Sequence, residues 1–205
     1  MKLEERPPWV IPGLSPSLQF QKCGQYFFDR KNWDEAIEYF TKALVAGSDK
    51  MSVITNRSYS YFAQEKYDEA LKDGQMSVDT DPSWLEGHLC MGLSLEKLQR
   101  PAEAVKCYEF GLTYDPEWKE GHIRVGLAYL KIEQPEAAKQ AFLNGLEVDA
   151  ACPRLRAGLA EANEVLASFI PPPGPATLES HFVVKPESPP KPEPANIRPP
   201  WVFIV

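Results

Sequence analysis

The sequence lacks any long apolar run, and this absence bears on where the protein resides. No stretch reaches the roughly eighteen consecutive apolar residues that a membrane-spanning helix needs. The opening segment MKLEERPPWVIPG has no apolar core behind its charges, so no secretion signal is expected. These absences predict a soluble protein with no membrane partner, residing in the cytoplasm, with the nucleus as the other compartment to consider.

Clustered cysteines and basic blocks are also missing. Cys23, Cys90, Cys107 and Cys152 show no CxxC spacing and no histidine at metal-ligand intervals, which predicts buried free thiols and neither a metal nor a cofactor. The formal net charge is -7 and no Lys/Arg-rich block occurs. Because phosphate backbones are bound by clustered cations, nucleic acid is not an expected partner.

What the sequence does contain is an internal repeat with a period of thirty-four residues. Small and large residues recur at fixed offsets in four successive segments. A small residue on one helix lets a second helix approach closely, and a large one fills the space beside it. The pattern predicts two short antiparallel helices per repeat, with these matching columns: Gly24, Ser58, Gly92 and Gly126; Ala36, Ala70, Ala104 and Ala138; Phe40, Gly74, Tyr108 and Phe142.

Prolines mark the ends of the predicted helices. Asp-Pro pairs at 81–82 and 115–116 are expected to end second helices, because proline lacks an amide donor and disfavours helical geometry in the residue before it. Pro101 and Pro135 are expected to open second helices, since the first-turn amide is unpaired in any case.

The columns resemble those of the tetratricopeptide repeat family. The resemblance implies an all-α, right-handed α-solenoid of four helix-turn-helix repeats, over residues 17–50, 51–84, 85–118 and 119–150. Residues 151–169 contain an amphipathic segment, Pro153–Phe169, that predicts a helix capping the last repeat. Residues 1–16 form a short apolar, proline-containing lead, and the proline-rich composition of residues 170–205 predicts a disordered tail.

A solenoid of this family implies protein–protein interaction and no enzyme activity. Its first helices line a concave groove, which is expected to receive a peptide or helix of another protein as an adaptor or scaffold does. Thr55, Cys90 and Ile123 are predicted to lie on the exposed face of this groove. The principal groove residues predicted are Gln21, Gln25, Asn56, Tyr59, Phe62, Glu86, Leu89, Leu93, Arg124 and Leu127.

One alternative is a heat-shock cochaperone that binds acidic C-terminal tails. Chaperone adaptors of this family hold the terminal carboxylate in a clamp of Lys, Asn and Arg side chains. In this sequence Asn56, within NRSYSY, fits one clamp position. The other four positions fall on Gln21, Gln25, Glu86 and Cys90, which cannot supply the cations, so the clamp is predicted to be incomplete. A non-catalytic subunit of a larger enzyme complex is the other alternative.

Two histidines and a repeated pentapeptide are further features of the sequence. His88 and His122 share one column, where a large packing residue is usual, so packing is expected and catalysis is not. The pentapeptide RPPWV occurs at residues 6–10 and again at 198–202; each copy either covers an apolar edge or serves as a docking peptide. A further hypothesis places residues 201–205 in the groove of their own chain until a partner displaces them.

Overall fold

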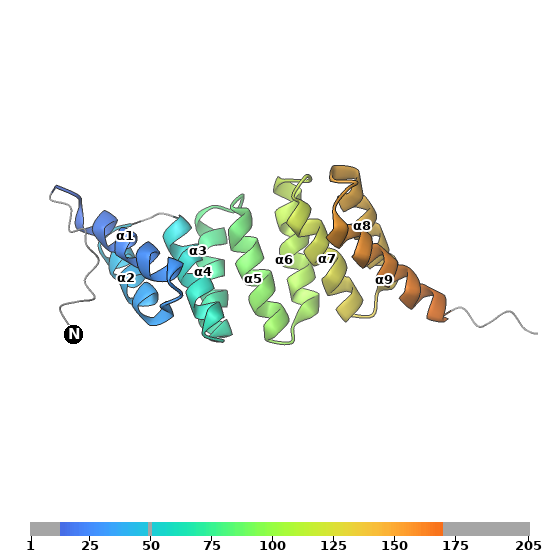
Figure 1. Cartoon of the computed structure of the whole chain (residues 1–205), viewed down its shortest axis with the longest axis horizontal. Coiled ribbons are helices and arrows are strands. Elements are labelled where there is room, and N and C mark those ends of the chain that lie inside the picture. Colours follow the sequence, from blue (N-terminus) through green and yellow to red (C-terminus); the bar gives the residue numbers. More distant parts are fainter. Residues whose placement is uncertain (1–12, 49–50, 170–205) are drawn as a thin grey trace, which may run out of the picture. The chain divides into compact units, whose positions relative to one another are not determined.

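Nine α-helices follow one another along residues 13–48 and 51–169, the part of the chain that this computed structural model describes. Figure 1 shows them side by side in chain order. No strand occurs in these residues, so the described part is an all-α solenoid. The helices are α1 (Pro16–Asp29), α2 (Trp33–Val45), α3 (Met51–Ala63), α4 (Tyr67–Thr80), α5 (Leu85–Lys97), α6 (Pro101–Tyr114), α7 (Lys119–Lys131), α8 (Pro135–Val148) and α9 (Pro153–Phe169).

Each helix packs mainly on its neighbours in the sequence. The odd-numbered helices α1, α3, α5 and α7 are the first helices of the repeats, and the even-numbered helices α2 to α8 are the second helices. Further contacts join α1 with α3, α3 with α5, and α7 with α9. The lead up to residue 12 and the tail from residue 170, including both RPPWV copies, lie outside the described residues.

Helix ends follow the proline signals of the sequence. Pro101 and Pro135 occupy the first turns of α6 and α8. Asp81 and Asp115, which precede the predicted proline stops, are the C-cap residues of α4 and α6. These expected helix ends are confirmed.

The turn inside each repeat has a conformation that the sequence analysis missed. One residue per repeat adopts a left-handed backbone with φ between 58° and 60°, and none of the four is glycine. In the first repeat the following amide, of Asn32, donates back to the Phe27 carbonyl at 2.9 Å and closes the end of α1. The four left-handed residues are Lys31, Glu65, Gln99 and Glu133.

Close helix contacts occur where small residues face large ones. A Cβ added to Gly92 would lie 2.1 Å from Cε1 of Tyr108, and one added to Gly126 would lie 2.5 Å from Cε1 of Phe142. Tyr108 and Phe142 are fully buried. The predicted pairing of small and aromatic columns is therefore present, and it fixes how closely the two helices of a repeat approach.

The second repeat replaces an apolar contact with a buried ion pair. The Arg57 guanidinium donates to both carboxylate oxygens of Asp73 at 2.7 Å, and also to Thr41 Oγ1 at 3.0 Å. Only 12% and 5% of the two charged side chains are exposed. All the polar atoms of the pair have partners, which offsets the cost of burying the two charges. One repeat later the same columns hold the apolar residues Met91 and Cys107.

Helix α9 covers the end of the stack. Leu155 and Ala162 are fully buried against α7 and α8, and an added Cβ at Gly158 would lie 2.4 Å from Phe142. Its other face is polar and exposed. In the described ranges no helix combines the length and apolar character required to cross a membrane.

Candidate functional site

The predicted groove residues are distributed over four successive first helices, and we call this set the first-helix surface. Gln21 and Gln25 lie on α1, Asn56, Tyr59 and Phe62 on α3, Glu86, Leu89 and Leu93 on α5, and Arg124 and Leu127 on α7. Glu86 is exposed and the other nine are partly buried. All ten therefore present some surface to solvent, as a binding face requires.

A hydrogen bond joins the first two helices of this surface. The Asn56 side-chain amide donates to Gln25 Oε1 at 2.8 Å, and the Gln25 amide in turn donates to Asp29 Oδ1 at 2.7 Å. The two side chains that join α1 to α3, Gln25 and Asn56, are both uncharged. Asn56 is thus engaged with the residue at which the family clamp places a second asparagine.

Tyr59 links the second repeat to the third and fourth. Burial raises the pKa of Tyr59 far above its usual value, and the nearby Cys90 and Glu86 raise it further, while Arg124 opposes them. The Tyr59 hydroxyl consequently remains neutral and serves as a hydrogen-bonding group. Side chains from α3, α5 and α7 are close enough here to influence one another.

A charged cluster lies at the α7 end of the surface. Glu120 accepts hydrogen bonds from Arg124 Nε at 2.7 Å and from Arg154 Nη1 at 2.6 Å. Burial opposes ionisation of Glu120, but the two guanidinium groups hold its pKa below the ordinary value. The cluster carries two positive charges and one negative charge, and it ties α9 to α7.

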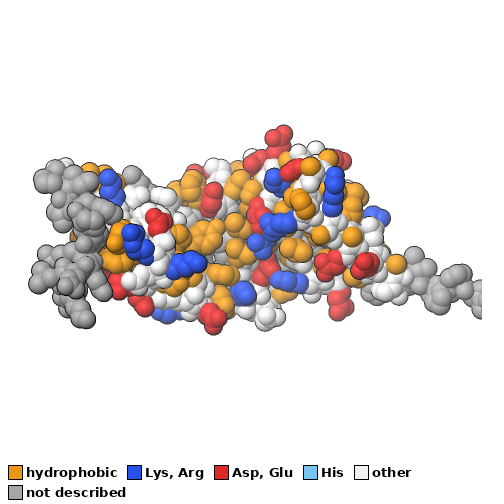
Figure 2. Space-filling view, viewed as in Figure 1, with side chains coloured by type: hydrophobic (Ala, Val, Ile, Leu, Met, Phe, Trp, Pro, Cys, Tyr) orange, Lys and Arg blue, Asp and Glu red, His pale blue; other side chains and the backbone are white. Residues whose placement is uncertain are grey.

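Apolar side chains occupy the remainder of the surface. Leu89 and Leu127 pack partly against the buried core, and the Phe62 ring meets Tyr67 edge-on at a centroid distance of 5.3 Å. On the face drawn in Figure 2, hydrophobic side chains lie between separate groups of both charge signs. A mixed surface of this kind suits an amphipathic segment better than a highly charged one.

Three residues that were expected on the exposed face are instead buried. Thr55 is 3% exposed, and Cys90 and Ile123 are each 2% exposed. Thr55 Oγ1 donates to the Met51 carbonyl of its own helix at 2.8 Å. The expectation was wrong for these positions because their side chains face the interior: Ile123, for example, packs in a buried cluster with Phe142 of α8 and Leu155 of α9.

The structure also bears on the carboxylate clamp. Burial raises the pKa of Cys90 to about 11, so this position offers a neutral thiol beneath the surface. Glu86 is negatively charged, and Gln25 is already bonded to Asn56. Among the described residues, the clamp positions supply no cation for a terminal carboxylate.

Hollows occur on the opposite side of the stack, between consecutive second helices. One of about 470 Å³ lies between α2 and α4, one of about 440 Å³ between α4 and α6, and one of about 400 Å³ between α6 and α8. In each hollow, residues of the intervening first helix form the floor. The sequence analysis missed them, although the thirty-four-residue columns place equivalent residues at each one.

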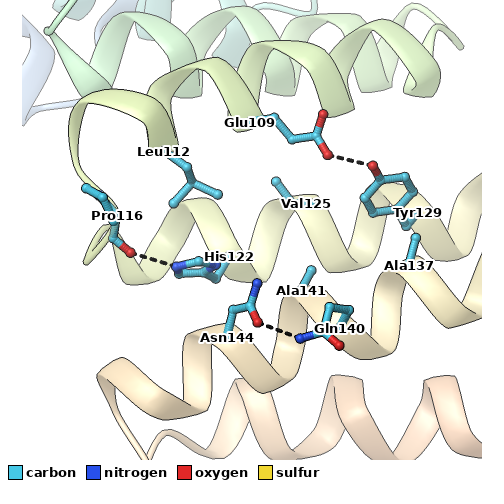
Figure 3. Close-up of a pocket in the computed structure, with 10 residues that line it drawn as sticks. All are labelled: Glu109, Leu112, Pro116, His122, Val125, Tyr129, Ala137, Gln140, Ala141 and Asn144. Carbon is cyan, nitrogen blue, oxygen red and sulfur yellow. Dashed lines mark hydrogen bonds between the residues drawn. The ribbon is translucent and has the colours of Figure 1, made fainter.

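The hollow between α6 and α8 is shown in Figure 3. Val125 and Tyr129 of α7 lie between the two second helices, and Tyr129 donates to Glu109 at 2.5 Å. Gln140 donates to Asn144 at 2.7 Å. These polar groups are bonded to one another within the wall, so the hollow offers mainly apolar surface.

The two histidines are packing residues, as their shared column predicts. His88 and His122 are 1% and 8% exposed, and the Nε2 atom of each lies 2.8 Å from the carbonyl of Pro82 and Pro116, respectively. Within residues 13–48 and 51–169, no group of three His, Cys, Asp or Glu side chains is placed to hold a metal ion. The four cysteines are free, and two of them, Cys23 and Cys107, are only partly buried.

Comparisons with known proteins agree with this architecture. Residues 24–83 and 120–152 match models described as tetratricopeptide repeat. Heat shock protein STI1 of Saccharomyces cerevisiae is 35% identical over 75 residues, which is 36% of this chain and 13% of that protein. DnaJ homolog subfamily C member 7 of Mus musculus is 34% identical over 73 residues, 36% of this chain and 15% of that one. The chain thus matches only about a seventh of the length of these relatives.

Solved structures share the fold at low sequence identity. A crystal structure of MamA protein has a TM-score of 0.68 at 14% identity and covers 75% of this chain and 84% of its own. The first TPR of Spaghetti (RPAP3), bound to the HSP90 peptide SRMEEVD, has a TM-score of 0.55 at 23% identity, covering 58% and 95% of the two chains. Residues 24–83 and 120–152 are therefore similar in sequence to tetratricopeptide repeats, and the described part of the chain has the all-α solenoid fold of these solved structures.

Proposed function

We propose that this chain is a non-catalytic adaptor that binds a peptide or helix of a partner protein on its first-helix surface. The observation that carries the proposal is the continuity of that surface. The bond from Asn56 to Gln25 connects α1 with α3, α3 also packs on α5, and Arg124 of α7 lies near enough to Tyr59 to affect it electrostatically. A ligand lying along it would meet neutral amides first, then aromatic and leucine side chains, and then the arginines around Glu120.

The chemistry of the surface favours a ligand of mixed character. Partly buried Leu89, Leu93 and Leu127 can cover apolar side chains of the ligand. Arg124 donates to Glu120 through Nε alone, which leaves the rest of its guanidinium for an acceptor on the ligand. We therefore propose a partner segment with apolar anchors and an acceptor group near its α7 end.

The relatives suggest a chaperone tail as a second candidate. The structure of the RPAP3 repeat holds an HSP90 peptide, and STI1 is named a heat shock protein. Against this candidate stands the composition of the clamp positions, where Glu86 has the wrong charge and Gln21 and Gln25 are neutral. Each missing hydrogen bond to a charged group removes roughly 1.5 to 3 kcal/mol.

Titration with the acidic peptide Met-Glu-Glu-Val-Asp separates the two candidates. By calorimetry we expect no binding at micromolar concentrations, because the missing cations weaken a micromolar complex to about the millimolar range. Restoring cations with Gln21→Lys and Glu86→Lys should strengthen binding of this peptide. Micromolar binding by the unaltered chain would establish the chaperone candidate in place of ours.

Affinity purification tests the first-helix surface itself. Partners captured by the full chain should be lost with Leu93→Gln and Arg124→Gln, because the first replaces an apolar side chain by a polar one of similar size and the second removes a charged donor group. They should be retained with Val45→Gln, which alters an 85% exposed residue on α2. Mass spectrometry of the captured proteins gives the readout, and equal losses in all three variants would contradict the proposal.

A further inference from the structure

The exposed apolar side chains of the described residues gather on one side of the stack. All six large hydrophobic residues that are exposed lie on second helices, away from the first-helix surface. Exposed apolar side chains that contact one another can mark a site of interaction, and among these six Phe110 and Tyr114 do so. The six are Val45, Met76, Phe110, Tyr114, Leu143 and Val148.

An aromatic platform on α6 stands out among them. Phe110 and Tyr114 are 49% and 45% exposed, and their rings meet edge-on with centroids 5.4 Å apart. Both rings contact His88, with centroid distances of 5.6 Å and 6.3 Å. The imidazole is itself fixed by its contact with the Pro82 carbonyl, so the platform is rigid.

The next repeat provides an internal comparison. His122 makes the same contact with a proline carbonyl, but the columns of Phe110 and Tyr114 hold Asn144 and Val148 there. The histidine contact therefore occurs without an aromatic pair above it. The two exposed rings are therefore not part of what holds the histidine in place in every repeat, and their outer faces are open to solvent.

Acidic residues outnumber basic residues around the platform, where Lys106 precedes Phe110 and Lys72 precedes Met76 by one helical turn. Residues 75–83 and 109–118, which include the C-terminal halves of α4 and α6, contain no Lys or Arg. The last turns of α4 and α6 have no basic residue, as is also the case in α1, α3, α8 and α9. Helix C-termini add partial negative charge of their own. The acidic residues in these two stretches are Asp79, Asp81, Glu109, Asp115 and Glu117.

From this combination we infer a second binding site, separate from the first-helix surface, formed by Phe110, Tyr114 and Met76 on the second helices. Met76 is 46% exposed and occupies the column of Phe110 one repeat earlier, at the edge of the hollow between α2 and α4. The excess of acidic over basic residues favours one ligand: a basic amphipathic segment of a partner protein, with bulky apolar side chains beside Lys or Arg. Aromatic faces also attract cations, which adds to the same preference.

The test is a titration of the full chain with a labelled amphipathic peptide of leucine and lysine, followed by fluorescence anisotropy. We expect saturable binding that weakens as salt is raised, because exposed charges are screened. A peptide in which glutamate replaces every lysine should not bind. Equal binding of the two peptides would overturn the inference.

Variants locate the site. The double variant Phe110→Ser and Tyr114→Ser should weaken binding by about tenfold or more, as expected for aromatic anchors. Asp79→Asn with Glu117→Gln should weaken it and reduce its salt dependence, and these substitutions leave the rings in place. Leu143→Ser, an apolar-to-polar change at an exposed residue of α8 outside the acidic stretches, should bind like the unaltered chain.

Controls separate the competing outcomes. Circular dichroism melting identifies a variant that has lost its fold. If the Phe110→Ser and Tyr114→Ser variant does not fold, the Asp79→Asn and Glu117→Gln variant tests the site by itself. Binding unaffected by either double variant would place the peptide elsewhere. Sedimentation of the chain alone identifies self-association; a dimer that the Phe110→Ser and Tyr114→Ser variant dissociates would assign the platform to a second copy and overturn the inference.

Discussion

At the scale of single residues, Arg57 is the position whose role differs most between sequence and structure. In the sequence it is a charged residue at a column that is otherwise apolar. In the structure it forms a buried pair with Asp73, sixteen positions later on the facing helix. The pair could have been found from the sequence, because two apolar columns change to opposite charges in the same repeat.

Removing one partner of this pair should be more damaging than removing both. Arg57→Met leaves Asp73 buried without a partner, which should lower the free energy of unfolding by about 3 kcal/mol. The double variant Arg57→Met and Asp73→Ala restores an apolar contact like that of the later repeats and should recover much of this loss. Urea unfolding measures both, and a double variant less stable than the single one would contradict the account.

At the scale of helices and turns, the left-handed residues between first and second helices matter most. Lys31, Glu65, Gln99 and Glu133 recur at the same place in every repeat with φ near 60°. Side chains with a Cβ disfavour this conformation, and glycine accepts it readily. Nothing in the sequence predicts this backbone conformation. The four residues are polar or charged, and none is the glycine that commonly occupies a left-handed helix cap.

Gln99→Gly should therefore stabilise the protein. Relief of the unfavourable φ outweighs the added freedom of the unfolded chain, and we expect a gain of about 0.5 to 1 kcal/mol. Ala102→Gly, three residues later inside α6, should instead cost about 1 kcal/mol because it weakens a helix. The melting temperatures of the two variants give the comparison. A decrease of the melting temperature in both variants would show that the left-handed backbone at Gln99 does not destabilise the protein.

At the scale of the whole molecule, periodicity predicted most of the fold. The columns of Gly92 and Tyr108 anticipated how paired helices pack, and the prolines anticipated where they end. The burial of Thr55 and Cys90 was not foreseen, because it depends on how closely successive first helices approach, which a single repeat does not encode. The second-helix hollows were missed for the same reason: each needs three helices from two repeats.

Because each helix mainly contacts its neighbours, damage at one end should remain local. Leu155→Ala removes a fully buried side chain under α9 and should cost about 3 kcal/mol. Hydrogen exchange read by mass spectrometry should accelerate in α7 to α9 and stay unchanged in α1 to α4. Glu161→Ala, at an exposed position on α9, should leave exchange unaltered throughout. Equal acceleration along the chain would indicate that the repeats unfold as one unit.

The position of α9 in the repeat register has a consequence for engineering. Pro153 follows Lys119, the first residue of α7, by one full repeat, so the cap begins where another first helix would begin. Arg154 of α9 already contacts Glu120, its counterpart one repeat earlier. A duplicate of residues 119–152 spliced in front of Pro153 would keep the α8–α9 junction and would place a second α7 where α9 now begins, with the Glu120 of the duplicate in the place of Arg154. The array is therefore extendable by whole modules at this junction, with one terminal helix closing arrays of different length.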